Sequence, residues 1–273
     1  MNGSNAKIGI IAGGGNFPKM AANAAKARGI EVVIAAIHGE TASDIEKYAD
    51  KTEWVKLGQL GKIINIFNKA HVTKALMAGT IKKRRLFDGI MPDIRGLSLI
   101  TKLTLFHDDS ILSSIAHEFE KDGIEIISST SYLPELLACE GIFTKKKPNK
   151  EEQEEIKLGI KMVKELGKLD IGQCVVIRKK TVLAVEALEG TDETIRRGGN
   201  LAREGAIVVK ASKPTQDLRF DIPTVGLDTI NTMSEVRASV LAIEAGKTLI
   251  FDKEEMIAAA DKNGICIVSV NMN

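Results

Sequence analysis

The stretch Ile8-Gly-Ile-Ile-Ala-Gly-Gly-Gly-Asn-Phe-Pro18 decides the fold of the N-terminal half of this chain. Its first five residues form a short apolar run, and three consecutive glycines follow. An alanine-rich segment then extends to about Arg28, Gly29 ends it, and a second apolar run occupies residues 30–37. A strand, a glycine turn, a helix and a strand in this order are typical of a βαβ unit, in which a parallel sheet is buried on both faces.

The rest of the N-terminal half continues this alternation. Further strands are predicted at 75–79 and 124–127. One helix is expected to end near Lys69, and another opens at 107–112 and ends before Gly123. Alternating strands and helices favour a parallel sheet with helices on both faces. We therefore expect an α/β fold with a parallel-sheet, Rossmann-like N-terminal domain over residues 1–134.

A charged segment with a glycine and a proline follows at 140–155, which predicts a linker at 135–150. Beyond it we expect a C-terminal α/β domain with a mixed sheet over residues 151–273, because two of its strands are close enough to form a β-hairpin around Lys179-Lys180. The expected helices are 151–167, 232–245 and 253–262, the last capped by Asp252, and the expected strands are 172–178, 181–187, 205–211, 247–251 and 265–270.

Composition limits the function classes. The 273 residues are 44% hydrophobic and carry a net charge of +2, so they can bury ordinary cores and give no overall case for nucleic-acid binding. Cys139, Cys174 and Cys266 form no metal-binding or paired pattern, which fits a reducing cytosol. The N-terminus lacks a signal-peptide pattern, and no apolar run is long enough to span a membrane. We expect a cytoplasmic protein, with peripheral membrane contact left open.

The glycine turn has two interpretations. It could let a nucleotide or phosphate approach the backbone and the following helix N-terminus, or it could be a purely structural tight turn. A dinucleotide fingerprint is disfavoured, because Pro18 stands where the third glycine belongs and Glu40 is a poor match to the ribose-binding acid. The candidate substrate-binding residues of this turn are Gly13, Gly14, Gly15, Asn16 and Phe17.

A second group of charged residues lies at 186–197. Glu186 ends an apolar strand, and a buried carboxylate needs a partner or a metal ion. Thr191 and Asp192 begin a helix, and Arg196 follows about one turn later. This arrangement fits either a capped helix with a solvated ion pair or a phosphate site formed by a helix N-terminus and an arginine.

A polar loop follows the 205–211 strand, with the sequence Lys213-Pro-Thr-Gln-Asp-Leu-Arg-Phe-Asp-Ile-Pro-Thr-Val-Gly226. Two prolines and a glycine discourage a continuous helix there. Loops on rigid scaffolds often carry chemistry, although the same residue types also build solvated turns. The side chains of interest are Lys213, Gln216, Asp217, Arg219, Asp221 and Thr224.

The remaining polar groups have simpler explanations. The basic run 82–85 is typical of a solvated face, and its place after a strand keeps an anion or lipid-headgroup role open. Asp108 and Asp109 fit a helix N-cap and first turn. The four histidines are scattered, and no two have the spacing of a metal-binding helix pair.

The two polar groups of the C-terminal half share one chemistry. Acids that could hold Mg²⁺ alternate with cations that could neutralise phosphate, as phosphoryl chemistry requires. No metallophosphoesterase set, Nudix box or Walker A loop is present. The residues alone predict a two-domain α/β protein that binds a phosphorylated ligand. A non-catalytic nucleotide- or lipid-binding protein and an oxidoreductase are the alternatives.

Eight segments add a resemblance that covers nearly the whole chain in order. VEALEGTDE (185–193) and KPTQDLRFDIPTVG (213–226) are the most specific parts. In these segments the chain resembles the LpxI family, the UDP-2,3-diacylglucosamine pyrophosphatases of lipid A biosynthesis. The matching segments extend over 11–18, 58–63, 78–97, 118–127, 169–177, 182–199, 213–226 and 245–265. The basic run after Ile81 is longer than the family leads us to expect.

The resemblance implies hydrolysis of UDP-2,3-diacylglucosamine to UMP and 2,3-diacylglucosamine 1-phosphate with Mg²⁺. It also implies two domains with the lipid product held between them, and homodimers. The aspartate on which the family relies falls at Asp221, as a metal ligand or a water-orienting carboxylate. We expect Glu186 or Asp192 to assist it in holding Mg²⁺. The expected substrate-binding side chains of the C-terminal half are Thr191, Arg196, Lys213, Gln216, Arg219 and Thr224.

Overall fold

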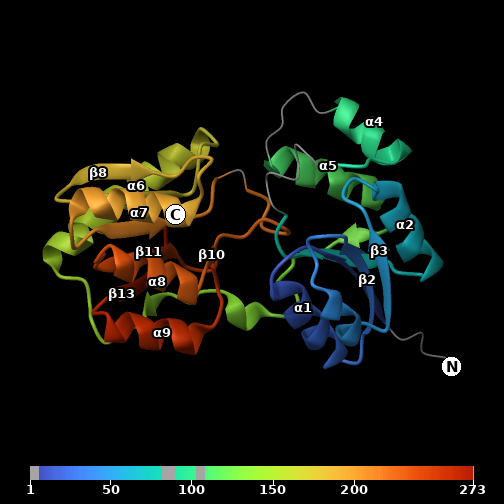
Figure 1. The fold of residues 1–273 in the computed structure, drawn as a ribbon, viewed down its shortest axis with the longest axis horizontal. Helices are drawn as coiled ribbons and strands as arrows, with labels where there is room; N and C mark the ends of the chain where they lie inside the picture. The colour runs from blue at the N-terminus through green and yellow to red at the C-terminus, as the bar shows by residue number, and fades with distance from the viewer. Residues whose placement is uncertain (1–5, 82–89, 103–107, 215, 273) are drawn as a thin grey trace. The chain divides into compact units, whose positions relative to one another are not determined.

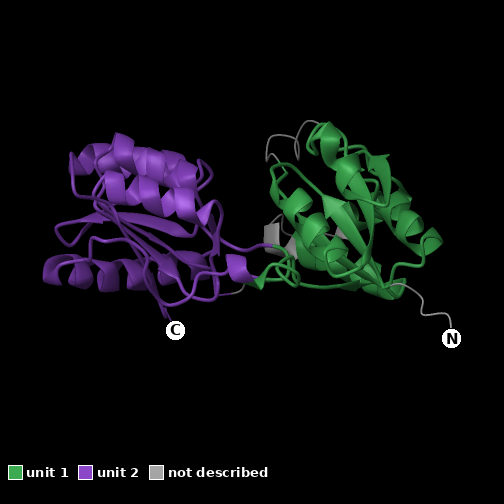
Figure 2. Cartoon of the chain, turned by 90° about the horizontal axis from the view of Figure 1, so that it is seen from below, with its two compact units in different colours: residues 1–134, 217–220 green, residues 135–216, 221–273 purple. Residues whose placement is uncertain are grey.

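The computed structural model describes residues 6–81, 90–102, 108–214 and 216–272. The chain forms two compact units, of which unit 1 comprises residues 1–134 and 217–220 and unit 2 comprises residues 135–216 and 221–273 (Figure 2). The chain therefore passes between the units three times. Two of these passages lie inside the polar loop 213–226. The basic run 82–85 lies outside the described residues.

Unit 1 is built on a five-stranded parallel sheet with the order β3-β2-β1-β4-β5 (Figure 1). The chain starts at the central strand and adds strands first on one side and then on the other, as in a doubly wound fold. The predicted Rossmann-like parallel sheet is therefore confirmed. The elements of unit 1 are β1 (Lys7–Ala12), α1 (Phe17–Lys26), β2 (Glu31–Ile37), η1 (Ser43–Tyr48), β3 (Lys51–Val55), α2 (Leu60–Lys69), β4 (Lys74–Ala78), α4 (Ile94–Lys102), α5 (Asp108–Lys121) and β5 (Glu125–Ile126). The short helix η2 (Pro134–Leu136) spans the boundary at which the chain enters unit 2.

The core of unit 1 explains one glycine of the opening stretch. Phe67 on α2 and Phe119 on α5 are fully buried, with their ring centroids 6.1 Å apart. The Phe67 ring lies so close to β1 that a Cβ atom at Gly9 would stand 2.8 Å from it. Because a contact that short would force the buried ring to move, the packing favours glycine at this position of the strand.

Unit 2 is built on a six-stranded mixed sheet with the order β6-β13-β11-β9-β7-β8. The strands β9, β11 and β13 are parallel, and β7 is antiparallel to both of its neighbours, so β8 runs in the same direction as β9. The elements are β6 (Gly141–Ile142), α6 (Lys150–Lys168), β7 (Cys174–Arg178), β8 (Thr181–Val185), α7 (Thr191–Ala202), β9 (Ile207–Lys210), β10 (Thr224–Val225), α8 (Leu227–Glu235), β11 (Val240–Glu244), β12 (Leu249–Ile250), α9 (Lys253–Lys262) and β13 (Cys266–Val270).

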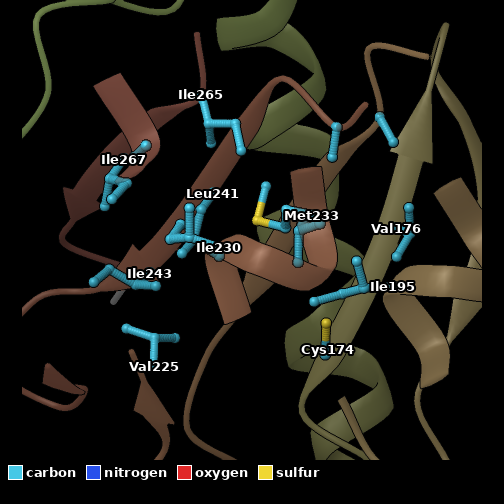
Figure 3. Close-up of a cluster of buried hydrophobic side chains, with 14 of the residues drawn as sticks. Cys174, Val176, Ile195, Val225, Ile230, Met233, Leu241, Ile243, Ile265 and Ile267 are labelled. Carbon is cyan, nitrogen blue, oxygen red and sulfur yellow. The ribbon is translucent and has the colours of Figure 1, made fainter. Parts of the chain in front are cut away.

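The two faces of this sheet carry separate cores. One face packs against α7, α8 and α9, where Ile195, Ile230 and Met233 meet alternate residues of the central strands (Figure 3). The other face packs against α6 through Ile156 and Val163. Burial on both faces explains why the central strands are almost uninterrupted apolar runs.

The hairpin prediction is confirmed, and one helix prediction is wrong. β7 and β8 pair as antiparallel strands, and Lys179 and Lys180 between them have φ of 49° and 59°, as a two-residue hairpin turn requires. The predicted helix 232–245 is instead the end of α8 followed by β11. Arg237, with φ of 53°, separates them, and β11 is buried between β9 and β13, so tertiary packing overrides the helix-like pattern.

The segment 135–150, predicted as a linker, groups with unit 2, and its β6 pairs with β13 at the edge of the sheet. One further sequence expectation differs from the structure. Asp252 does precede α9, but its side chain makes no capping hydrogen bond and its backbone is left-handed. A reciprocal capping box does occur at another helix: Asn149 and Glu152 cap the N-terminus of α6.

Candidate active site at the carboxyl edge of the second sheet

Four strands of unit 2 end at the same edge of its sheet, because β8, β9, β11 and β13 share one direction. Glu186 follows β8, Lys210 ends β9, and Glu244 ends β11. The polar loop 213–226 leaves β9 at this edge. In open α/β sheets, ligands bind beyond the carboxyl ends of the strands. This edge is therefore the candidate active site, and it contains Asp221.

The loop is fixed by side chains at both of its ends. The Gln216 amide accepts a hydrogen bond from the Lys213 backbone N–H at 2.9 Å and donates one to Asp221 Oδ2 at 2.5 Å. Lys210 is only 6% exposed, and its ammonium donates to the carbonyl oxygen of Thr224 at 2.8 Å. Asp221 therefore lies between two anchored points.

Lys213 carries an ion pair. Its Nζ lies 2.7 Å from Asp170 Oδ1, and both side chains are mostly buried. A charged pair in a partly buried setting resists rearrangement more than an exposed pair. The Lys213 charge is placed at this edge by a residue that precedes β7 in the sequence.

The predicted acid Glu186 is buried and has hydrogen-bond donors. Thr191, the first residue of α7, donates to Glu186 Oε1 at 3.0 Å, and the Gln173 backbone N–H lies 3.4 Å from Oε2. Burial, followed by the negative charge of Glu186, raises the pKa of the neighbouring Cys174 thiol, while Lys210 opposes this shift. Cys174 pairs with Lys210 across β7 and β9, and its carbonyl accepts from the Glu186 N–H, so the buried thiol lies between these two charged residues.

Glu244 joins three neighbours at the same edge and is 1% exposed. Lys164 Nζ approaches it to 2.7 Å and Lys247 Nζ to 3.1 Å, and Ser212 donates both its backbone N–H and its hydroxyl. Burial alone would raise the pKa of Glu244, but these donors and cations outweigh it and hold the pKa below its usual range. Glu244 is therefore a buried, charged side chain that holds Lys164, Lys247 and Ser212 together near the start of the loop.

The middle of the loop belongs to the other unit. Residues 217–220 group with unit 1, where the Ser129 N–H donates to the Arg219 carbonyl at 2.7 Å. The Arg219 guanidinium pairs with Asp217 and with Glu120, which lies 99 positions earlier in the sequence. Hydrogen bonding to Arg219 lowers the pKa of Asp217. The contacts of Arg219 thus hold the loop on unit 1.

Arg196 also has structural partners. Its guanidinium binds Glu193 at 2.7 Å and Glu235 at 2.9 Å, and it approaches the Thr232 hydroxyl at 3.4 Å. These contacts join α7 to α8. The geometry therefore favours the ion-pair interpretation of Arg196, and its role as a phosphate ligand stays a prediction.

The glycine turn of unit 1 is tightly packed against the loop after β4. Gly13 and Gly14 donate their N–H groups to Ala78 and Thr80 at 2.8 Å, so these amides serve the fold. A Cβ atom at Gly13 would lie 2.6 Å from the Thr80 carbonyl oxygen. Gly15 and Asn16 are exposed at the start of α1, and Phe17 is half-buried. The structural interpretation thus accounts for the first two glycines.

The predicted metal ligands differ in their surroundings. Asp221 is half-buried, Glu186 is buried, and Asp192 is exposed in the first turn of α7. Within the part of the chain that the structure describes, no three carboxylate, imidazole or thiol groups gather closely enough to hold a metal ion. Mg²⁺ commonly binds one or two carboxylates and completes its shell with water and substrate phosphates. A Mg²⁺ site formed by Asp221 with Glu186 or Asp192 therefore stays a prediction.

Sequence reasoning missed three residues of this edge. Lys210 is a lysine within a buried strand, and a charge inside an apolar run could have indicated it. Glu244, which ends the apolar run 240–243, carries the same signal, whereas Asp170 gave none, because its partner Lys213 is distant in the sequence. Among the described residues, no helix is long and apolar enough to cross a membrane.

Comparison with known proteins gives the family. The model of the LpxI N-terminal domain matches residues 7–136, and that of the LpxI C-terminal domain matches residues 139–268. A protein of Caulobacter vibrioides named UDP-2,3-diacylglucosamine pyrophosphatase LpxI is 33% identical over 276 residues, which cover 97% of this chain and 98% of that protein.

Solved structures give weaker likenesses. Phosphoribosylglycinamide synthetase from Anaerococcus prevotii is 13% identical with a TM-score of 0.28, over 70% of this chain and 42% of that one. N5-carboxyaminoimidazole synthetase from Staphylococcus aureus is 14% identical with a TM-score of 0.27, over 71% and 44%. The two domain matches and the Caulobacter relative establish that this chain belongs to the LpxI family.

Proposed function

We propose that this protein hydrolyses the pyrophosphate bond of UDP-2,3-diacylglucosamine in lipid A biosynthesis, releasing UMP and 2,3-diacylglucosamine 1-phosphate. The observation that carries the proposal is the full-length match to the Caulobacter enzyme, which extends across both units. The structure supports it with a polar edge on unit 2, where acids and cations meet at the ends of parallel strands.

The reaction needs one water molecule and a dianionic leaving group. The water oxygen bonds to one of the two phosphorus atoms, and the bridging P–O bond to the other breaks. The water protons leave to solvent as the two phosphate products form. An electrostatic environment that offsets the negative charge of the pyrophosphate is the largest contribution that a protein can make to such a step.

Asp221 is the residue to which we assign the central role, as a carboxylate that orients the water or binds the metal ion. It is half-buried at the edge and held by Gln216. Mg²⁺ when bound would neutralise phosphate charge and acidify a bound water molecule. Glu186 and Asp192 are the proposed assisting carboxylates. Glu186 lies beside the start of α7 through its bond to Thr191.

Lys210 and Lys213 supply positive charge at the same edge. The Lys213 ammonium is oriented by Asp170, and the Lys210 ammonium by the Thr224 carbonyl. Fixed cations at the place where anionic charge develops are more effective than mobile surface lysines. We propose that Lys213 faces the substrate phosphate, and that Thr191 and Thr224 line the same edge.

We further propose that the protein works in the cytoplasm as a homodimer with peripheral contact to the inner membrane. The substrate proposed here carries two acyl chains, so the enzyme must meet it at a lipid surface. Unit 1 presents Met91, Ile94 and Leu97 as exposed apolar side chains around the start of α4. Apolar side chains gathered on one surface are typical of contacts with lipid or with another chain.

The test is release of UMP from UDP-2,3-diacylglucosamine in detergent micelles, with and without Mg²⁺. We expect hydrolysis that stops when the metal is chelated and resumes when Mg²⁺ is restored. UDP-N-acetylglucosamine, which carries only an acetyl group at position 2 and no long acyl chain, serves as the control and should be a poor substrate. Tight binding of the diacylated nucleotide without UMP release under any metal condition would instead favour a non-catalytic binding protein.

A further inference from the structure

The side chain of Gln216 has its orientation fixed by chemistry. It is 8% exposed, and its Oε1 accepts from the Lys213 backbone N–H at 2.9 Å. A backbone N–H can only donate, so Oε1 must point toward Lys213 and Nε2 must point the other way. Nε2 donates to Asp221 Oδ2 at 2.5 Å. The amide therefore cannot flip without losing both bonds.

The position of this hydrogen bond in the chain is equally informative. Gln216 is the last residue of unit 2 before the chain leaves for unit 1, and Asp221 is the first residue after it returns. The four residues between them are held by Glu120 and by the Ser129 N–H. The bond from Gln216 to Asp221 thus ties the two ends of this excursion together within unit 2.

A carboxylate at such a point has two sources of freedom. Its backbone follows an excursion that is anchored on another unit, and its own side chain can rotate about two bonds. The buried Gln216 amide holds one carboxylate oxygen at hydrogen-bond distance. It therefore restricts rotation of the Asp221 side chain and also limits movement of the Asp221 backbone. Positioning a reacting group within a fraction of an ångström can change a rate by about a hundredfold.

We propose that Gln216 is the positioning residue of Asp221, fixing the carboxylate on unit 2 in its working orientation. This inference rests on the proposed function of Asp221. A positioning role replaces the sequence-based expectation that Gln216 binds substrate. The amide oxygen of Gln216 already accepts from the Lys213 N–H, and its amide nitrogen already donates to Asp221. Gln216 acts through Asp221 and contributes to turnover and not to affinity.

The test compares two substitutions with a matched control. Gln216→Met keeps the length of the side chain and removes both bonds, so kcat should fall about tenfold to a hundredfold while KM stays within about threefold. Gln216→Glu keeps the acceptor for the Lys213 N–H but places a like charge beside Asp221, so kcat should fall as well. Gln153→Met removes a glutamine of the same unit, whose amide donates to the Pro148 carbonyl, and should leave both constants unchanged.

Hydrogen exchange of the backbone amides of residues 213–226 provides a readout besides activity. Protection should decrease in Gln216→Met and Gln216→Glu. It should return in the double variant Gln216→Glu with Asp221→Asn, because the new amide can donate to the new carboxylate in the reversed direction. This double variant should stay inactive, since the carboxylate is then at the wrong position.

Two outcomes would overturn the inference. Wild-type kcat and wild-type protection in Gln216→Met would show that the bond is dispensable. A raised KM with unchanged kcat would show that Gln216 binds substrate. Asp221→Asn, measured alone, separates the two proposals: an inactive Asp221→Asn with a fully active Gln216→Met contradicts only the positioning role, whereas an active Asp221→Asn contradicts the proposed function as well.

Discussion

The ammonium of Lys210 lies 2.8 Å from the carbonyl oxygen of Thr224, and this buried contact joins the end of strand β9 to the returning end of the loop that carries Asp221. A buried ammonium usually lies near a carboxylate. Here the recipient is a backbone carbonyl three residues after the proposed catalytic aspartate. The Lys210 contact therefore fixes the loop at Thr224, near its C-terminal end, while Gln216 fixes it near Lys213, at its N-terminal end.

The first prediction concerns this anchor. Lys210→Met keeps the volume and removes the charge, so the fold should change in stability by about 2 kcal/mol or less, since the lost hydrogen bond is offset by the relief of a buried charge. The kcat for UMP release should fall about tenfold or more because the loop is released. Steady-state kinetics with thermal unfolding measures both effects. Lys157→Met, on the exposed side of α6, is the control and should change neither kcat nor the unfolding temperature. An unchanged kcat in Lys210→Met would show that Lys210 does not anchor the loop.

The second prediction concerns Glu244 and acid. Glu244→Gln leaves Lys164 and Lys247 without their buried partner and should cost about 3–5 kcal/mol at pH 7. The folded pKa of Glu244 is lowered, so its stabilising effect is complete above about pH 4.3, the ordinary glutamate value, and is lost as the pH falls through the folded pKa. Calorimetric unfolding temperatures of the two proteins should therefore converge below about pH 4.

Glu154→Gln is the matched control for that experiment, because Glu154 is an exposed carboxylate on α6 that pairs with the exposed Lys157. It should show no comparable gap at pH 7. A gap between wild type and Glu244→Gln that stays constant from pH 7 to pH 3 would mean that the charge of Glu244 is not what stabilises this edge.

The third prediction concerns the glycine turn. Gly13→Ala brings a Cβ atom within 2.6 Å of the Thr80 carbonyl, so the backbone must shift and unit 1 should lose about 1–3 kcal/mol. Urea unfolding followed by the fluorescence of Trp54, the only tryptophan of the chain, reports on this unit. Gly15→Asn is the control, since Gly15 has φ of 84° and open space, and asparagine tolerates that conformation. Equal stability of the two variants would contradict the close approach.

The fourth prediction concerns Arg196. Because its guanidinium is taken by Glu193 and Glu235, Arg196→Met should leave kcat/KM within about twofold of wild type. The measurement is the rate of UMP release over a range of substrate concentrations. An increase of about tenfold or more in KM would restore the sequence-based interpretation of Arg196 as a phosphate ligand.

The sequence predicted most elements whose pattern is set locally. The βαβ start, the Lys179-Lys180 hairpin and the helix at 253–262 follow from runs of apolar residues bounded by glycines or charges. The strand β11 was missed because its apolar run reads equally well as the continuation of a helix. Only its pairing with β9 and β13, through contacts distant in sequence, makes it a strand.

The site was predictable as a set of residues but not as an arrangement. The segment 213–226 was identified from its polar residues and prolines, yet nothing local indicates that residues 217–220 belong to unit 1. The same holds for Arg219 and Glu120, and for Lys213 and Asp170, whose partners are set by the topology. Charges in a sequence show what chemistry is available, and the fold decides which of them are already engaged.

The most direct test of the central claim is UMP release from UDP-2,3-diacylglucosamine by the Asp221→Asn variant. The substitution keeps the size of the side chain and removes its charge, so we expect the variant to unfold at nearly the wild-type temperature and to bind the substrate. Its kcat should fall by about a thousandfold or more, as expected when a group essential to the transition state is removed. Turnover within a few-fold of wild type in the folded variant would contradict the assignment of Asp221.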